Sequence, residues 1–145
     1  MNASRADQTL ISLPFGNMRF RVEIEGLPGA GCVEVIFPEG RIARSRASSK
    51  DSARYTNLTL RRGLTSSRDW YSWWDQARGP MLRQRKRVGR AIVVSLLNEL
   101  GEQGHRWLFA DATPIAYQLS SLHALGSELV MEMLELKVAG FRLEE

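Results

Sequence analysis

Residues 53–78 constrain the fold more than any other stretch, because they read as a strand, a tight turn and a short helix in direct succession. The strand is predicted from Tyr55 to Arg62, where leucines alternate with polar residues as expected for a sheet with one buried face. Gly63 ends this alternation. The helix that follows carries one apolar stripe at the spacing i, i+3, i+4 and i+7, formed by Trp70, Trp73, Trp74 and Ala77.

This predicted helix has clear start and stop signals. Ser66 or Ser67 is expected to cap its first turn, where the negative charge of Asp69 suits the exposed N–H groups. Gly79 and Pro80 are expected to end it. Each tryptophan can bury roughly 150–250 Å², so we expect the helix to plug the open side or end of a sheet, with three core anchors, Trp70, Trp73 and Trp74. An aromatic platform for bases or sugars is disfavoured, because the rings share a helical stripe instead of standing on a strand.

The chain length sets the domain count. With 145 residues and 16.4 kDa, residues 1–145 are expected to form a single domain that buries about two-thirds of its unfolded surface. One cysteine, Cys32, excludes an internal disulfide and a cysteine-based metal site. His105 and His123 are too few for a metal cluster, and we expect no metal and no cofactor.

The N-terminal segment carries no targeting signal that we recognise. It lacks the apolar core of a signal peptide, and no stretch approaches the roughly 20 apolar residues of a membrane span. We therefore expect assembly in the cytoplasm. Residues 1–17 are polar and then rich in turn formers, which predicts a flexible N-terminal arm.

Positive charge is concentrated in two segments of the chain. The net charge is +4 and the isoelectric point is near 9.7. Residues 41–54 and 81–90 together hold ten basic residues and one acid, a net +9, so the rest of the chain carries −5. Such an uneven distribution suits either nucleic-acid binding or contact with an acidic patch on a neighbouring molecule.

The N-terminal half has two further predicted strands. In the strand Arg19–Glu25 the apolar residues Phe20, Val22 and Ile24 share one face, and the opposite face is fully charged through Arg19, Arg21, Glu23 and Glu25. A shorter strand is predicted over Cys32–Phe37. Residues 39–54 show no apolar periodicity and are predicted to be a long, mobile, basic loop, which in a compact domain is usually functional or disordered.

The C-terminal half is predicted to consist of strands joined by hairpin turns. We expect strands over Val88–Leu97, Arg106–Ala110 and Ile115–Leu119, the last two separated by Pro114. In Glu128–Val138 the apolar phase shifts at Leu134, which predicts a β-bulge or a strand covered on both faces. The total is about seven strands and one short helix. The predicted fold is a mainly antiparallel β-barrel or sandwich capped by the helix.

No catalytic motif is present. A phosphate-binding loop, a His-Glu-x-x-His motif and a Gly-x-Ser-x-Gly nucleophile elbow are all missing from the sequence. The glycine-rich segment 26–31 precedes a strand, not a helix, so it is not a dinucleotide cradle. The carboxylate pairs Glu23/Glu25 and Glu132/Glu135 are interpreted as solvated or paired charges. The residues alone therefore indicate a basic, non-catalytic β-domain.

Five short stretches in order resemble the tail tube protein family of contractile-tailed phages and related contractile injection systems. They span roughly residues 18–138 and are Phe20–Gly26, Tyr55–Gly63, Trp70–Arg78, Trp107–Pro114 and Gly126–Leu136. The resemblance implies a β-barrel like that of the haemolysin-coregulated protein of type VI secretion. It also implies a structural role without enzymatic activity.

The resemblance further implies an assembly and its partners. Six copies would form a ring, and rings would stack into a hollow tube that a contracting sheath drives through a target membrane. The implied partners are further copies of the chain, the sheath, the baseplate and spike proteins, and a cargo that the lumen could carry, with no specific nucleic acid. The family's long loop, here residues 39–54, would reach the next subunit or ring through Arg41, Arg44, Arg46, Lys50 and Arg54. The copy could be the main tube or a tube-initiator ring.

The charged strand face fits such a ring, because a hexamer could line a wet lumen with it. We therefore expect Arg19, Arg21, Glu23 and Glu25 to face the lumen. The competing hypothesis is a nucleic-acid-binding β-barrel that uses residues 41–54 and 83–90 as a phosphate track, with affinity that falls steeply with salt. It lacks the exposed aromatic residues on strands that RNA-binding sheets use. A small-ligand enzyme has no support beyond the barrel interior.

Overall fold

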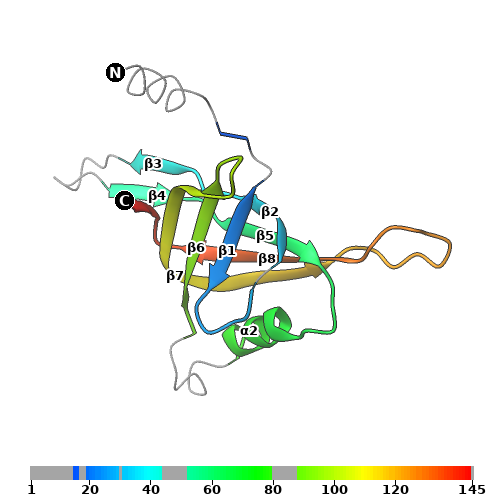
Figure 1. The fold of residues 1–145 in the computed structure, drawn as a ribbon. Coiled ribbons are helices and arrows are strands. Elements are labelled where there is room, and N and C mark those ends of the chain that lie inside the picture. The colour runs from blue at the N-terminus through cyan, green and yellow to red at the C-terminus, as the bar shows by residue number, and fades with distance from the viewer. Residues whose placement is uncertain (1–14, 17–18, 30, 44–51, 80–87, 145) are drawn as a thin grey trace.

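The computed structural model describes residues 15–16, 19–29, 31–43, 52–79 and 88–144 (Figure 1). The predicted flexible arm, residues 1–17, lies almost wholly outside these ranges. The described elements follow in the order β1 (Phe20–Ile24), β2 (Cys32–Ile36), β3 (Gly40–Ala43), β4 (Ser52–Tyr55), β5 (Leu58–Gly63), α2 (Asp69–Ala77), β6 (Arg90–Leu97), β7 (Gln103–Leu119), β8 (Met131–Val138) and β9 (Arg142–Glu144).

One curved antiparallel sheet dominates the molecule. Its seven strands follow the order β1-β6-β7-β8-β5-β2, with β9 paired to β7, while β3 and β4 form a separate two-stranded sheet. The sheet curls so that β1 and β2, at the two ends of the path, lie near each other, and α2 lies below it (Figure 1). The mainly antiparallel β-fold with one short helix, predicted from the sequence, is confirmed for the described residues. None of the helices there is long and apolar enough to cross a membrane.

The alternation predicted for the first strand is confirmed. Val22 and Ile24 are buried, and they face Val94 and Ile92 of β6 across the antiparallel ladder. Arg21 and Glu23 point the other way and are exposed. The period of two therefore places the apolar face inside the curled sheet, where the core residues of β1, β5, β6, β7 and β8 meet.

The predicted strand Tyr55–Arg62 is in fact two strands of different sheets. Tyr55 ends β4, and Leu58 begins β5. Thr56 lies between the two strands and makes two hydrogen bonds with Glu39. The Thr56 amide donates to the Glu39 carbonyl at 3.1 Å, and the Thr56 Oγ1 accepts from the Glu39 amide at 2.7 Å. Within β5 the predicted inward phase is confirmed, since Leu58 and Leu60 are fully buried.

The predicted loop over residues 39–54 contains two strands, so this part of the prediction was wrong. β3 and β4 pair antiparallel, with Arg41 opposite Arg54 and Ile42 opposite Ala53. Residues 44–51 lie outside the described ranges. Hydrophobic periodicity could not reveal the pair because its one large aliphatic side chain, Ile42, is 69% exposed. Backbone pairing and the packing of Tyr55 against Phe141, with ring centroids 5.7 Å apart, hold the pair instead.

Pro114 does not interrupt β7, contrary to the sequence prediction. β7 runs unbroken for 17 residues. Its ladder with β6 ends at the pair Ala112–Arg90, so a proline beyond that point costs no hydrogen bond on the β6 side. On the β8 side the register shifts between Pro114 and Ala116, which marks a bulge.

The phase shift predicted in the last long strand has a different cause from the one expected. β8 pairs with β5 in continuous register, and the bulge lies in β7 instead. Glu132 occupies the inward phase of β8 together with Leu134, Leu136 and Val138. A buried charge therefore stands where the apolar pattern required a hydrophobic residue. The short strand β9 was not predicted at all, because three residues carry too little pattern.

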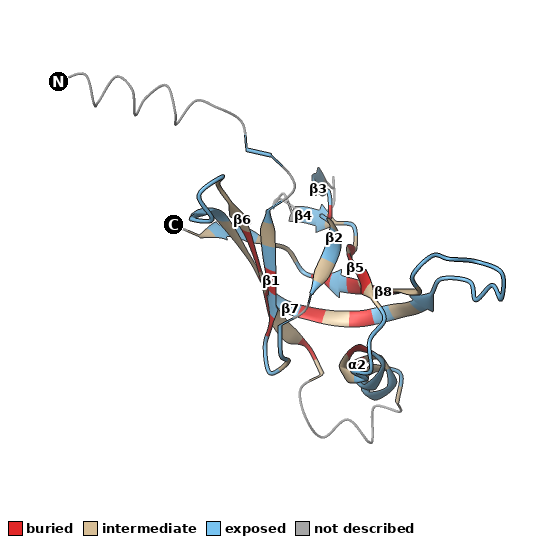
Figure 2. Cartoon of the chain, turned by 45° about the vertical axis from the view of Figure 1, so that its right-hand side comes forward, coloured by how far each residue is buried: buried red, intermediate tan, exposed pale blue. Residues whose placement is uncertain are grey.

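The helix α2 buries two of its three predicted anchors in the core. Trp70 and Trp73 are 0% and 1% exposed, whereas Trp74 is only partly buried against the core cluster. Figure 2 shows α2 with both buried and exposed segments. The indole Nε1 of Trp73 donates to the Val88 carbonyl at 2.8 Å. The predicted serine cap was wrong: the N-cap residue is Arg68, which makes no side-chain cap hydrogen bond. Asp69 lies in the first turn as expected, where its Oδ1 accepts the Trp70 amide at 2.8 Å.

Candidate functional site

The charged face of β1 extends over neighbouring strands of the sheet. Arg19, Arg21, Glu23 and Glu25 are all exposed, so the structure brings the four predicted lumen residues onto one surface. Register places the buried Ser95 of β6 opposite Arg21, and Arg106 of β7 opposite Ser95. Arg106 Nε lies 3.4 Å from the Glu144 carboxylate of β9. The outer face of this half of the sheet therefore carries charges of both signs, beside the half-buried Val93 and Leu108.

The basic segments are only partly within the described structure. Arg41 and Arg54 face each other across the β3–β4 ladder, and both are exposed. Arg44, Arg46 and Lys50 lie outside the described ranges, as do the basic residues of 81–87. Like charges directly opposite each other in a ladder are destabilising unless a counter-charge is near. Glu39 supplies one such charge through its ion pair with Arg41, and an acidic neighbour would supply more.

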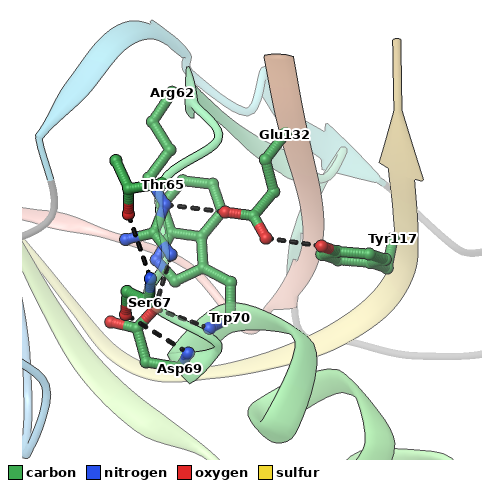
Figure 3. A network of polar contacts seen from close by, with 7 residues as sticks. All are labelled: Arg62, Thr65, Ser67, Asp69, Trp70, Tyr117 and Glu132. Atoms are coloured by element: carbon green, nitrogen blue, oxygen red, sulfur yellow. Dashed lines mark hydrogen bonds and ion pairs between the residues drawn. The ribbon is translucent and has the colours of Figure 1, made fainter. Parts of the chain in front are cut away.

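A buried ionic network joins β5, β7, β8 and α2 (Figure 3). Arg62 is 5% exposed and Glu132 is 1% exposed, and Arg62 Nε lies 2.7 Å from Glu132 Oε1. The same guanidinium forms an ion pair with Asp69 at the start of α2. Tyr117 of β7 donates its hydroxyl to Glu132 Oε2 at 2.5 Å. The guanidinium carbon of Arg62 also stacks 4.0 Å from the centroid of the Trp70 ring.

The network shifts the pKa of three of its groups. Burial by itself lowers the pKa of Arg62, but hydrogen bonds and charge from Asp69 and Glu132 outweigh this and raise that pKa. For Asp69, burial acts to raise the pKa, and the hydrogen bonds from Arg62 and Ser67 together with the arginine charge lower it. Burial and the Glu132 carboxylate raise the pKa of the Tyr117 phenol. Arg62 and Asp69 are therefore held charged and Tyr117 neutral.

Sequence reasoning missed this network, although a signal for it exists. Arg62 is in phase with the buried Leu58 and Leu60, and Glu132 is in phase with the buried Leu134 and Leu136. Two opposite charges on the inward phase of two strands are the mark of a buried pair, because an unpaired charge there is too costly. The network fixes α2 against the sheet and offers no substrate-accessible cleft.

Nothing in the described ranges indicates metal or thiol chemistry. Those ranges contain no cluster of three or more His, Cys, Asp or Glu side chains that could hold a metal ion. Burial raises the pKa of the Cys32 thiol to about 12, so the thiolate that would act as a nucleophile is scarce at neutral pH.

Comparison with solved structures shows where this fold occurs. A chain in the sheath–tube complex of an extracellular contractile injection system, PVC, in its extended state has a TM-score of 0.68 and 19% identity, over 95% of this chain and 96% of that one. A chain in the baseplate of the anti-feeding prophage has a TM-score of 0.62 and 20% identity, over 92% and 97%. Hcp1 from Flavobacterium johnsoniae has a TM-score of 0.58 and 11% identity, over 86% and 93%. At these low identities, the structural similarity shows that the chains share a fold.

Family membership rests on the sequence comparison. No curated protein sequence matches this chain significantly. The family model described as T4-like virus tail tube protein gp19 matches residues 16–142, which is most of the chain and includes the helix and the strands β1 to β8. The resemblance proposed from the five short stretches is thereby confirmed. This protein belongs to the T4-like virus tail tube protein gp19 family.

Proposed function

We propose that this chain is the structural subunit of an inner tube, in which rings of six copies stack into a hollow conduit. The observation that carries the proposal is the family match over residues 16–142. The conduit would belong to a phage tail or to a contractile injection system, with a sheath around it and a baseplate and spike at its end. Two structural neighbours come from a sheath–tube complex and a baseplate. The subunit would act without catalysis, as the main tube or as the initiator ring.

The mixed-charge face supports a lumen on the β1 side of the sheet. Its exposed residues Arg21 and Glu23 alternate in sign along β1, and Arg106 and Glu144 continue that alternation on neighbouring strands. A channel lined in this way stays hydrated and attracts neither anionic nor cationic cargo strongly. Cargo that moves through the conduit would then slide without sticking to its wall.

The β3–β4 pair supports a contact between subunits. Arg41 and Arg54 present like charge side by side on a two-stranded sheet that is not part of the main sheet. An acidic surface on a neighbouring copy would relieve this repulsion, and the chain outside its two basic segments carries a net −5. We therefore assign residues 39–54 to the interface between subunits or rings, formed in the cytoplasm before the particle is released.

Light scattering of the purified chain tests this proposal. We expect particles of at least six times 16.4 kDa, and we expect Arg54→Glu to reduce assembly. Arg68→Glu is the matched control, because it makes the same charge change at an exposed position at the start of α2. A chain that stays monomeric at high concentration, and that binds nucleic acid with strong salt dependence, would contradict the proposal and favour the nucleic-acid-binding β-barrel.

A further inference from the structure

A long segment between β7 and β8 projects from the sheet. Residues 120–130, here called the leucine finger, extend well beyond the end of the sheet (Figure 1). The Ser120 amide donates to the Met131 carbonyl at 2.9 Å, and the Met131 amide donates to Ser120 Oγ at 2.8 Å, so the base of the finger is clamped. A turn closed by the Gly126 amide and the His123 carbonyl at 2.9 Å forms its tip.

The finger carries three leucines that its own chain leaves in water. Leu122, Leu125 and Leu129 are 79%, 92% and 81% exposed, and the finger is exposed over residues 120–129 (Figure 2). Single exposed leucines are common on protein surfaces, but three on one narrow projection form an apolar patch with no counterpart beneath it. Burial of these leucines under another surface would lower the free energy, because it removes apolar area from water.

The same chain has an apolar groove at the opposite end of β7. A cavity of about 480 Å³ lies between β1, β2, β6 and β7, and its wall includes Phe20, Val35, Phe37 and Trp107. Phe37 packs edge-on against Trp107 with ring centroids 5.0 Å apart. At the rim, Val33 and Phe37 remain 55% and 37% exposed. The groove is therefore open and apolar, and it is large enough for leucine side chains.

The finger cannot reach the groove of its own chain. Trp107 lies twelve residues before the end of β7 at Leu119, and beyond that end the finger projects away from the sheet (Figure 1). The five residues from the finger base to Leu125 span at most about 18 Å when fully extended. Only another molecule can therefore bring the two apolar surfaces together.

We propose that the leucine finger of one copy inserts into the apolar groove of the next copy. A projection and a pocket at different places on one chain can make a head-to-tail contact, which generates closed rings or open stacks. This inference rests on the proposed tube function and specifies one contact that builds it. Leu125, at the tip, would fill the groove between Val33 and Phe37.

Charge substitution at the fingertip tests the contact. We expect Leu125→Asp to raise the concentration at which assembly begins by more than about tenfold, the factor that corresponds to one leucine leaving a buried site. At concentrations below the onset of assembly its melting temperature should equal that of the wild type, because Leu125 is 92% exposed and lies outside the core cluster. The matched control is Leu100→Asp, since Leu100 is also an exposed leucine, at 81%, and belongs neither to the finger nor to the groove lining. This control should assemble normally.

Mixing two defective variants tests the direction of the contact. Leu125→Asp keeps an intact groove, and Val33→Asp keeps an intact finger, so each alone should stay monomeric at moderate concentration. A one-to-one mixture should form a dimer through the single remaining finger–groove contact. Disulfide trapping between Leu125→Cys and Val33→Cys, in a Cys32→Ser background, should yield cross-linked ladders only when both cysteines are present.

The outcomes separate this inference from the proposed function. Normal assembly of Leu125→Asp would overturn the finger–groove contact while leaving the tube function intact. Cross-linking of the Leu125→Cys variant with itself alone would also overturn it, because it would mean finger-to-finger pairing. A wild-type chain that never assembles would contradict the tube function and this inference together.

Discussion

The Arg62 guanidinium lies in the protein interior between the carboxylates of Glu132 and Asp69, and above the face of Trp70. A buried cation is tolerated only when such partners replace its lost hydration. The geometry supplies two carboxylates for one guanidinium, and the phenol of Tyr117 satisfies a remaining oxygen of Glu132. At the residue scale, the stability of the fold depends on keeping this network complete.

Removing one partner of the network should therefore be costly. We expect Glu132→Ala to lower the free energy of unfolding by about 3–5 kcal/mol, because it leaves the buried arginine with only one of its two carboxylate partners. Glu135→Ala is the matched control on the same strand. Its half-buried side chain accepts a hydrogen bond from Asn57 at 3.1 Å, so its loss should cost only about 1 kcal/mol. Urea denaturation measures the free energy of unfolding of both variants. Equal losses would contradict the claim that the fold depends on the buried network.

The titration of Tyr117 and Cys32 should make the protein sensitive to alkali. Burial and Glu132 raise the pKa of Tyr117 above its usual 10.0, and burial raises that of Cys32 from 9.0 to about 12. In the unfolded chain these groups ionise at their usual values, so stability is fully present below pH 9 and is lost as pH rises further.

Tyr117→Phe separates the two contributions to this alkaline loss. We expect the variant to be about 1.5–3 kcal/mol less stable at neutral pH, because it loses a hydrogen bond to a charged group. Above pH 10 its free energy of unfolding should fall less steeply with pH than that of the wild type. Thermal melts across the pH range provide the measurement, and parallel curves for the two proteins would show that Tyr117 titrates normally.

At the scale of elements, α2 is fixed by the two tryptophans that face the sheet. Trp70 and Trp73 are fully buried, and the Trp73 indole also satisfies the Val88 carbonyl. We expect Trp73→Ala to cost about 3–5 kcal/mol of stability. Trp74→Ala should cost clearly less, because this ring is only half-buried. Denaturant unfolding measures the loss of stability in both variants. A larger loss for Trp74→Ala than for Trp73→Ala would contradict the assigned buried face.

Sequence patterns predicted the elements that are held in the fold by a buried side-chain face. β1 and α2 bury one face, so a period of two and a period of 3.6 were visible in Val22–Ile24 and in Trp70–Trp73. β3, β4 and β9 are held by backbone pairing at exposed positions, and no apolar pattern marks them. The predicted strand break at Pro114 was wrong. Whether a proline interrupts a strand depends on where the neighbouring strand ends, and the local sequence does not contain that information.

The candidate site was predicted less completely than the fold. The charged face of β1 follows directly from alternation, so Arg21 and Glu23 were found. The Arg62–Glu132 pair was hidden, because two residues 70 positions apart meet only after the register between β5 and β8 is set. The end of the leucine finger was predicted as the start of the strand Glu128–Val138, since Leu129 continues the phase of Met131 and Met133, but the strand begins only at Met131.

At the scale of the whole molecule, assembly should change which surfaces solvent can reach. If the β1 face lines a lumen, a Glu23→Cys variant in a Cys32→Ser background should react with a small maleimide in both dispersed chains and tubes. A bulky polymer-linked maleimide should label only the dispersed chains, because the tube wall excludes it. Equal labelling of tubes by both reagents would place β1 on the outside of the particle.

Electron microscopy of the purified wild-type chain at increasing concentration tests the central claim most directly. The proposed tube function predicts rings of six copies with a central hole, and stacks of such rings at higher concentration. Particles that remain single 16.4 kDa chains under every condition, also beside sheath and baseplate proteins, would contradict the claim that this chain builds a conduit.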